Sequence, residues 1–379
     1  MTQTTSKSLQ KLANLRRPHE GLINLMPLQT GGMLTEAAKK ALVEFGDGYS
    51  VCDFCLGSLC NITNPPVREF VHELLPQFLG CEVATLTYGA RDGIFMVMHS
   101  LAKPGDLIIV DGNRHYTTVV AAERVGLNVI EVASSGYPEF KIDVNDYIPL
   151  IEKHNPKLIL LTYPDGNYGN LSDAKRLGEI AQEYDIPYIL NGAYAVGRMP
   201  VNMEGLGADF IVGSGHKSMA SAGPCGVLGM KKKWEEVVLR KSGTYSNKEV
   251  ELLGCTLRGT PLVTLMASFP SVAERVQHWG EQVSKAQWFS SELEKLGFHQ
   301  LGEKPHRHDL LHFETPILYD ISKKVRERGY FLYKELKERG IWGLQPGLTK
   351  AFHLSTFAAT KEQLQFVINS FKSILSKYS

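Results

Sequence analysis

Short apolar strands alternate with amphipathic helices through the middle of the chain, and this alternation constrains the fold more than any other feature. It predicts strands at Leu107–Asp111, Val129–Val132, Leu158–Thr162, Tyr188–Leu190, Phe210–Gly213 and Gly226–Met230. Helical periodicity predicts helices at Val67–Leu79, Gly93–Leu101, Thr118–Arg124 and Ala174–Tyr184. Strands separated by helices indicate an α/β fold with a mainly parallel sheet covered on both faces.

Polar segments follow several of these strands, at the edge where such a sheet binds its ligands. They run from Asp111 to Tyr116, Asp165 to Asn170, Asn191 to Tyr194 and Ser214 to Lys217. Because the carboxyl ends of parallel strands meet at one edge, we expect these segments to form a shared site.

The pattern changes after residue 257. A helical stretch covers Pro261–Leu296, with a break near His278, and strand and helix then alternate through Leu310–Glu314, Val325–Arg339, Ala351–Ser355 and Lys361–Ser376. A chain of 379 residues is long enough for two domains. We expect an N-terminal segment at 1–60, a large domain at 61–257 and a smaller α+β domain at 258–379.

Charge and composition exclude several functional classes. The 41 basic and 40 acidic residues give a formal charge of +1, so any RNA contact needs a local patch. The N-terminus lacks the apolar core of a signal peptide, and no run of about eighteen apolar residues could span a membrane. Six cysteines in a chain this long do not form a disulfide scaffold. We therefore expect a cytoplasmic protein whose cysteines are free, metal-bound or catalytic.

A lysine follows one predicted strand among small residues. Ser214-Gly215-His216-Lys217 comes directly after Gly213, and a second small-residue stretch at 220–226 leads into the next strand. Glycines let the backbone approach a cofactor, Ser214 and His216 can donate to phosphate, and the Lys217 amine can form an imine with a carbonyl. A solvated surface lysine is the simpler alternative for an isolated residue. The context favours a Schiff-base lysine.

A turn at Thr87–Gly93 precedes a predicted helix, whose free N–H groups and dipole would hold a phosphate. Taken in order with Asn191 and Lys217, this turn resembles the fold type I (aminotransferase-like) enzymes that use pyridoxal 5′-phosphate (PLP). The Ser-x-His-Lys signature is similar to that of the cysteine desulfurase branch. The resemblance runs from about residue 60 to the C-terminus.

The resemblance implies a role for each matching residue. Lys217 would hold PLP as a Schiff base and later carry the Cα proton, while His115 would stack on the pyridine ring. Asn191 would face the ring nitrogen and Asn167 the ring 3-oxygen. Active sites of this fold commonly lie at a dimer interface, which implies a homodimer. The remaining cofactor-binding residues would be Gly89, Ala90, Arg91, Ser214 and His216.

The sequence departs from the family pattern at three places. Asn191 replaces the aspartate that usually fixes a proton on the pyridine nitrogen, which suits an elimination better than a transamination. His353 stands where an arginine usually clamps the substrate carboxylate, so either it is a packed strand residue or the substrate carboxylate is esterified, as on tRNA. The chain has no cysteine after Cys255, so a desulfurase would lack its nucleophile.

Cys52, Cys55 and Cys60 form a C-x2-C-x4-C run. Buried structural thiols are one interpretation. The others are zinc, an iron–sulfur cluster or persulfide chemistry, which spacing alone does not separate. Together with the PLP motifs, Cys52, Cys55 and Cys255 resemble the archaeal Sep-tRNA:Cys-tRNA synthase family, in which matching cysteines handle sulfur as persulfides or on an iron–sulfur cluster. Cys81 and Cys225 are interpreted as structural.

That resemblance implies PLP-dependent β-replacement, from O-phosphoseryl-tRNA(Cys) to cysteinyl-tRNA(Cys) through a dehydroalanyl intermediate. Arg91, His115 and Tyr116 would bind the departing phosphate, and His353 would contact the substrate. Expected partners are the tRNA, the phosphoseryl-tRNA synthetase and an accessory tRNA-binding protein. Candidate RNA contacts are Lys7 to Arg17, Lys231 to Lys233, Lys323 to Arg326, and His306-Arg307-His308.

Two alternatives stay open on the sequence. One is a cysteine desulfurase or cysteine lyase that acts on free amino acid. The other is a non-catalytic tRNA-binding or iron–sulfur scaffold that retains the fold, although the intact surroundings of Lys217 speak against it.

Overall fold

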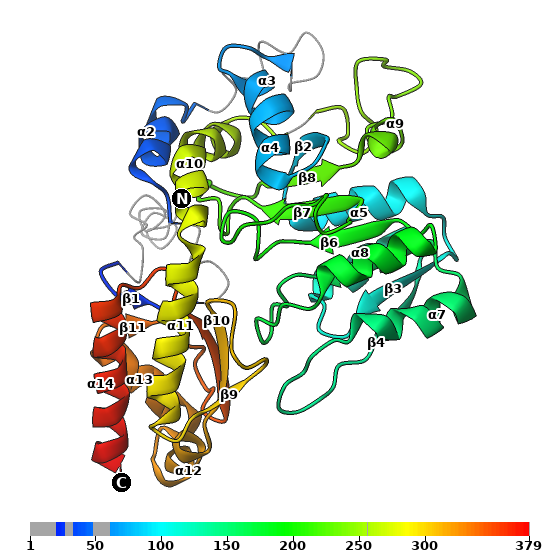
Figure 1. The fold of residues 1–379 in the computed structure, drawn as a ribbon. Helices are drawn as coiled ribbons and strands as arrows, with labels where there is room; N and C mark the ends of the chain where they lie inside the picture. Colours follow the sequence, from blue (N-terminus) through cyan, green and yellow to red (C-terminus); the bar gives the residue numbers. More distant parts are fainter. Residues whose placement is uncertain (1–19, 27–32, 48–60, 256, 379) are drawn as a thin grey trace, which may run out of the picture.

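The computed structural model describes residues 20–26, 33–47, 61–255 and 257–378 (Figure 1). Its centre is a seven-stranded sheet in the order β2-β8-β7-β6-β5-β3-β4. Strands β3 to β7 run parallel, while β8 is antiparallel to both β7 and β2. The mainly parallel α/β fold and the predicted strands of this region are confirmed, and β2 is an additional edge strand. The strands are β2 (Val83–Thr87), β3 (Leu107–Asp111), β4 (Asn128–Val132), β5 (Leu158–Thr162), β6 (Tyr188–Asn191), β7 (Phe210–Ser214) and β8 (Gly226–Met230).

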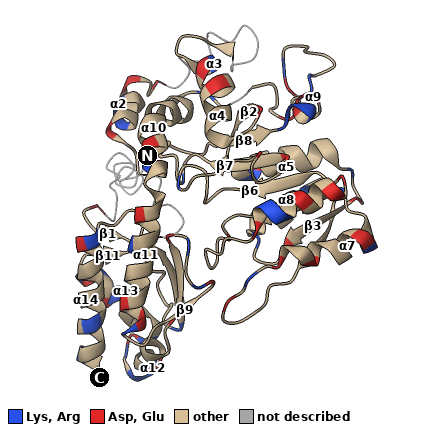
Figure 2. Cartoon of the chain, in the orientation of Figure 1, with Lys and Arg blue, Asp and Glu red and all other residues tan. Residues whose placement is uncertain are grey.

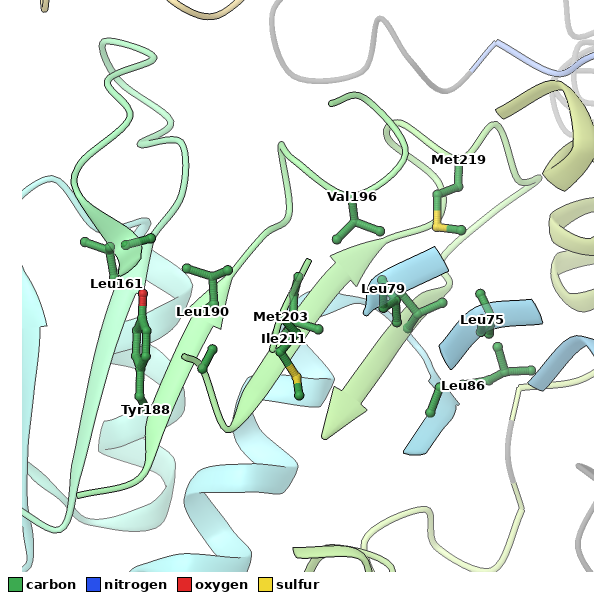
Figure 3. Close-up of a cluster of buried hydrophobic side chains, with 14 of the residues drawn as sticks. Leu75, Leu79, Leu86, Leu161, Tyr188, Leu190, Val196, Met203, Ile211 and Met219 are labelled. Carbon is green, nitrogen blue, oxygen red and sulfur yellow. The ribbon is translucent and has the colours of Figure 1, made fainter. Parts of the chain in front are cut away.

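Helices cover both faces of the sheet, and the side chains along each strand point alternately toward one helical layer and the other. Leu161, Leu190 and Ile211 point from adjacent strands into one core, part of which Figure 3 shows. Leu160 and Val212 face the opposite core. The first layer contains α4 (Leu75–Leu79), α7 (Tyr147–His154), α8 (Ala174–Glu183) and α10 (Thr260–Gln277), and the second contains α5 (Ala90–Leu101), α6 (Tyr116–Val125) and α9 (Glu235–Val238).

Helix α10 leads from the large sheet to the smaller domain (Figure 1). It packs on the large-domain core and against α2 (Glu36–Glu44). His278 is both its C-cap and the N-cap of the next helix, α11 (Trp279–Glu294). The predicted break near His278 is confirmed. Shorter elements of the large domain are α3 (Val67–Glu69), η4 (Phe70–Leu74), η5 (Val144–Asp146) and η6 (Lys232–Trp234).

The smaller domain is built on an antiparallel sheet in the order β12-β10-β9. Phe298, Phe313, Phe352 and Phe371 form the centre of its core. Strand β1 (Ile23–Asn24) pairs in parallel with β11 (Ile341–Trp342), so the N-terminal part of the chain joins this domain. The other elements are β9 (His299–Leu301), β10 (Leu310–Glu314), β12 (Ala351–Ser355), α12 (Pro316–Lys324), η7 (Arg328–Tyr330), α13 (Phe331–Glu338) and α14 (Lys361–Tyr378).

Predicted strands β10 and β12 and the C-terminal helix are confirmed, whereas α12 was not predicted. The domain limits at residues 60 and 257 remain a prediction. Among the described helices, none is both long and apolar enough to cross a membrane.

Candidate active site

Lys217 lies just after β7, and its side chain lines a cavity at the carboxyl edge of the sheet. The amine is 4.1 Å from the centre of the Tyr194 ring. Burial and, secondarily, the charges of Arg198 and Arg91 lower the pKa of Lys217 to about 8. A substantial fraction of the amine is therefore neutral near physiological pH, as a reaction with a carbonyl requires. The other predicted residues that line this cavity are Ala90, Arg91, His115, Asn191, Ser214 and His216.

The N-terminus of α5 forms one wall of the cavity. Its N-cap, Gly89, has a φ of 140°, which glycine adopts far more readily than other residues. Gly226 of β8 lies against it, since a Cβ at Gly226 would be 2.5 Å from the Gly89 carbonyl carbon. The first turn of α5, Ser214 and His216 line the same cavity. Helix-end N–H groups and these side chains form a donor set suited to a phosphate.

His115 is the N-cap of α6. Its Nδ1 accepts a hydrogen bond from the Thr117 N–H at 3.3 Å. Burial, then the charges of Lys217 and Arg91, lower the pKa of His115 to about 4. The ring is therefore neutral at pH 7, and its proton is on Nε2. Tyr116 packs beside it, with ring centres 4.3 Å apart, and is 66% exposed.

Asn191 and Thr162 end neighbouring strands at the floor of the cavity. The Asn191 Oδ1 accepts the Ala193 N–H at 3.3 Å, which leaves the Nδ2 group as the donor for a ligand. Asp111 accepts the Thr162 N–H at 2.7 Å and is buried. Burial raises the pKa of Asp111 to about 7. The floor of the cavity therefore presents the Asn191 amide. The Asp111 carboxyl group lies behind Thr162, outside the lining of the cavity, and is largely protonated below neutral pH.

His353 and Asn167 lie where the two domains meet. His353 on β12 is paired with His312 on β10, and their ring centres are 5.7 Å apart. His312 Nδ1 donates to the Asn167 carbonyl at 3.0 Å, while Asn167 is exposed and does not line the described cavity. Burial, then the neighbouring His312, lower the pKa of His353 to about 4. A neutral imidazole gives no bidentate cation for a carboxylate.

Of the cysteines expected to handle sulfur, the structure describes only Cys255. Cys52, Cys55 and Cys60 lie outside the described residues. Cys255 is a half-buried free thiol between α9 and α10, and it does not line the Lys217 cavity of its own chain.

The two remaining cysteines, Cys81 and Cys225, are also free. Burial raises their pKa values to about 11 and about 12, which fits the structural role expected of them. Across the described ranges, no group of three or more His, Cys, Asp or Glu side chains is placed to hold a metal ion.

The predicted RNA contacts differ in their surroundings. Basic and acidic residues are interspersed over both domains (Figure 2). Lys231 and Lys233 each lie 3.2 Å from Asp209, and Lys323 pairs with Asp320 at 2.8 Å. Residues 7–17 are outside the described part. His306 and His308 are buried and do not form a surface contact, and Arg307 pairs with Glu303 at 2.6 Å.

A larger cavity of about 600 Å³ lies along β2 beside α9. Its lysine, Lys241, pairs with Glu249, and the cavity is not at the carboxyl edge of the parallel strands. The chemistry described above therefore belongs to the smaller Lys217 cavity.

Sequence reasoning gave no individual role to five residues that line the Lys217 cavity: Ile94, Thr117, Thr162, Ala193 and Tyr194. Ala193 and Tyr194 lie in the segment from Asn191 to Tyr194 that was expected at the site, although neither was assigned a role. Thr117 and Thr162 carry no signal beyond their positions at a helix start and a strand end.

The chain matches the family described as O-phosphoseryl-tRNA(Sec) selenium transferase, SepSecS, over residues 56–376. It is 55% identical to the O-phospho-L-seryl-tRNA:Cys-tRNA synthase of Methanosarcina acetivorans and 56% identical to that of Methanosarcina mazei, over 98% of both chains in each case. A solved SepCysS–SepCysE N-terminal domain complex matches with a TM-score of 0.92 and 47% identity, over 100% of both chains. A cysteine desulfurase from Thermococcus onnurineus NA1 shares the fold, with a TM-score of 0.74 and 16% identity over 96% of this chain and 99% of that one.

Proposed function

The chain belongs to the SepSecS family, and on that premise we propose that it is a PLP-dependent transferase converting O-phosphoseryl-tRNA(Cys) to cysteinyl-tRNA(Cys) with a sulfur donor. The observation that carries the proposal is the Lys217 amine, which has a lowered pKa and lines a cavity walled by an anion-binding helix start. Relatives more than half identical over nearly the whole chain bear the corresponding name.

The residues around Lys217 fit PLP. The first turn of α5, Ser214 and His216 would hold its phosphate, and the neutral His115 ring would lie on the pyridine. The Asn191 Nδ2 group would donate to the ring nitrogen. When bound, PLP would supply the electron sink that acidifies the substrate Cα–H.

The chain's own groups would do the remaining work. The Lys217 amine would remove the Cα proton, which requires the neutral form that its pKa of about 8 makes available. Arg91 would receive the phosphate leaving Cβ through its guanidinium fork, assisted by His115 Nε2–H and Tyr116. His353 is neutral, and this suits a substrate whose carboxyl group is esterified to tRNA.

Sulfur would be delivered by Cys52, Cys55 and Cys255. If one of them carries a persulfide, its outer sulfur would bond to Cβ, and a second of these thiols would cleave the resulting disulfide, so that the product leaves as a thiol and the two cysteines are left as a disulfide. An iron–sulfur cluster held by them would instead release sulfide. Because Cys255 does not line the cavity of its own chain, we propose a homodimer in which Cys255 of one subunit serves Lys217 of the other. Leu253, two residues before it, is 95% exposed and is suited to burial in such an interface.

The same proposal includes the tRNA, the phosphoseryl-tRNA synthetase and a cytoplasmic location. An accessory tRNA-binding protein is a further proposed partner, because a relative's solved structure contains the SepCysE N-terminal domain.

The cofactor assignment is tested by reducing the purified protein with borohydride in the presence of PLP. We expect a mass adduct on the Lys217 peptide and its absence in Lys217→Ala, while the exposed-site control Lys324→Ala keeps the adduct. Anaerobic turnover of O-phosphoseryl-tRNA with sulfide then tests the reaction. Sulfide or alanine release from free cysteine at a matching rate would favour the desulfurase alternative.

The shared-site proposal is tested by coexpressing Lys217→Ala with Cys255→Ala. Each variant alone is expected to be inactive. Random pairing gives hybrids with one complete site, so roughly one quarter of wild-type activity should return. If Cys255 serves Lys217 of its own chain, no hybrid has a complete site and activity stays absent.

A further inference from the structure

Arg198 lies in the turn after β6 that also holds Tyr194, and the predicted site did not include it. Its side chain is fully buried, and Nη1 donates to Asp309 Oδ1 at 3.0 Å. The Nε and Nη2 groups have no protein partner within the described residues. Burying a guanidinium with one ionic partner is costly, so packing alone does not account for this residue.

Arg275 of α10 connects the Arg198 turn to the Lys217 loop. Its Nη2 donates to the Gly197 carbonyl at 2.7 Å and to the Ser218 carbonyl. The two backbones also touch, since a Cβ at Gly197 would lie 3.1 Å from the Ser218 carbonyl carbon. The residue before Arg198 and the residue after Lys217 are therefore held by a single guanidinium.

Asp309 and Phe357 of the small domain contact the two arginines. The guanidinium carbons of Arg198 and Arg275 lie 4.5 and 4.9 Å from the centre of the Phe357 ring. An aromatic face stabilises a cation without neutralising it. Two guanidinium groups with one bonded carboxylate leave a net positive charge beside the Lys217 loop.

We infer that Arg198 is a positioning residue whose buried charge favours the neutral form of the Lys217 amine, and that Asp309 of the small domain tunes this charge. The inference rests on the proposed role of Lys217 as the reactive amine. Burial and then Arg198 are the largest causes of the lowered pKa of that amine, in agreement with the geometry. The charged and titratable groups around Lys217 are Arg91 from α5, His115 from the start of α6, His216 from its own loop, and Tyr194 and Arg198 from the turn after β6.

The test measures the apparent pKa of Lys217 in the full-length protein after PLP is removed. Competitive acetylation with acetic anhydride over a pH series, read by mass spectrometry of the Lys217 peptide, reports the amine directly. Arg198→Met should raise this pKa by about one unit, because a neighbouring like charge is lost while the Asp309 carboxylate stays. Asp309→Asn should lower it, because Arg198 loses its counterion. Arg198→Lys keeps the charge and should stay near wild type.

The two variants are expected to shift the Lys217 pKa in opposite directions. A purely structural role predicts otherwise, because loosening of the fold would raise the Lys217 pKa toward the ordinary lysine value in both variants. Arg326→Met, at an exposed position of the small domain, is the matched control, and near-ultraviolet circular dichroism checks folding. An unchanged pKa in folded Arg198→Met, or shifts of the same sign in both variants, overturns the inference. If Arg198→Met does not fold, an Asp309→Asn pKa at or above wild type overturns it. The measurement needs no PLP, so failure of cofactor binding is a separate result.

Discussion

Asp111 is a buried carboxyl group that contacts Thr162 of the candidate site, and Asp111→Asn removes the free-energy cost of ionising it. The side chain is 1% exposed, and its Oδ2 accepts the Thr162 N–H at 2.7 Å. Its Oδ1 has no hydrogen-bond partner in the part of the chain that the structure describes. The amide oxygen of the variant can keep the bond from Thr162, so the main change is the loss of the titratable charge.

The magnitude follows from the pKa of about 7 that burial gives this group. Between pH 4 and 7 the folded protein keeps a proton on Asp111 that the unfolded chain has released, so stability falls as pH rises through this window. Each pH unit corresponds to about 1.4 kcal/mol. From pH 5 to about 7 the wild type therefore loses roughly 3 kcal/mol that Asp111→Asn does not lose.

Urea unfolding followed by circular dichroism at pH 5 and pH 8 measures this difference. The stability of Asp111→Asn relative to wild type should increase by roughly 3 kcal/mol between the two pH values. Asp320→Asn, at a site whose side chain is 64% exposed, is the control and should show little change. Parallel pH profiles for Asp111→Asn and wild type would refute the burial argument.

Three further predictions concern other parts of the molecule. Gly226→Ala places a methyl group 2.5 Å from the Gly89 carbonyl carbon, so PLP affinity in a fluorescence titration should fall about tenfold, whereas Gly280→Ala, with open space at its Cβ, should not change it. His353→Arg supplies a carboxylate fork, and calorimetry should show free O-phosphoserine binding about tenfold more tightly; unchanged affinity would contradict contact with the substrate. Although burial opposes it, hydrogen bonds from α14 and the end of α13 lower the pKa of Glu335 to about 2. Glu335→Gln should therefore lower Tm most near pH 7, with a difference that closes as pH falls toward 2.

The strands of the large domain were predictable because burial on both faces produces continuous apolar runs. Strands β3, β5 and β8 match their predicted limits. The edge strand β2 was missed because Thr85 and Thr87 interrupt its apolar pattern, although both side chains are buried in the sheet. Polar residues at such positions depend on tertiary packing, which local periodicity does not encode.

The candidate site also combines features that the local sequence predicts with features that depend on tertiary packing. The Lys217 loop and the Gly89 turn are local motifs, and the structure brings them together at one cavity. The ion pair between Arg198 and Asp309 joins two domains and has no local signature. Asn167 was predicted from a motif, but its contact with His312 of the small domain uses the backbone carbonyl. Any residue type could supply that carbonyl, so the contact does not explain the asparagine side chain.

The pairing of β1 with β11 determines when the chain can complete its fold during synthesis. Ile23 leaves the ribosome early, whereas its partner Ile341 is made near the end of translation. The seven-stranded sheet lies between residues 83 and 230 and can form first, since domains generally fold as units. Leu25, fully buried in the finished small domain, must wait for the C-terminal strands before it is covered. A ribosome stalled before Ile341 would therefore present a folded lysine loop together with an uncovered Leu25, and exposed apolar side chains are what chaperones recognise.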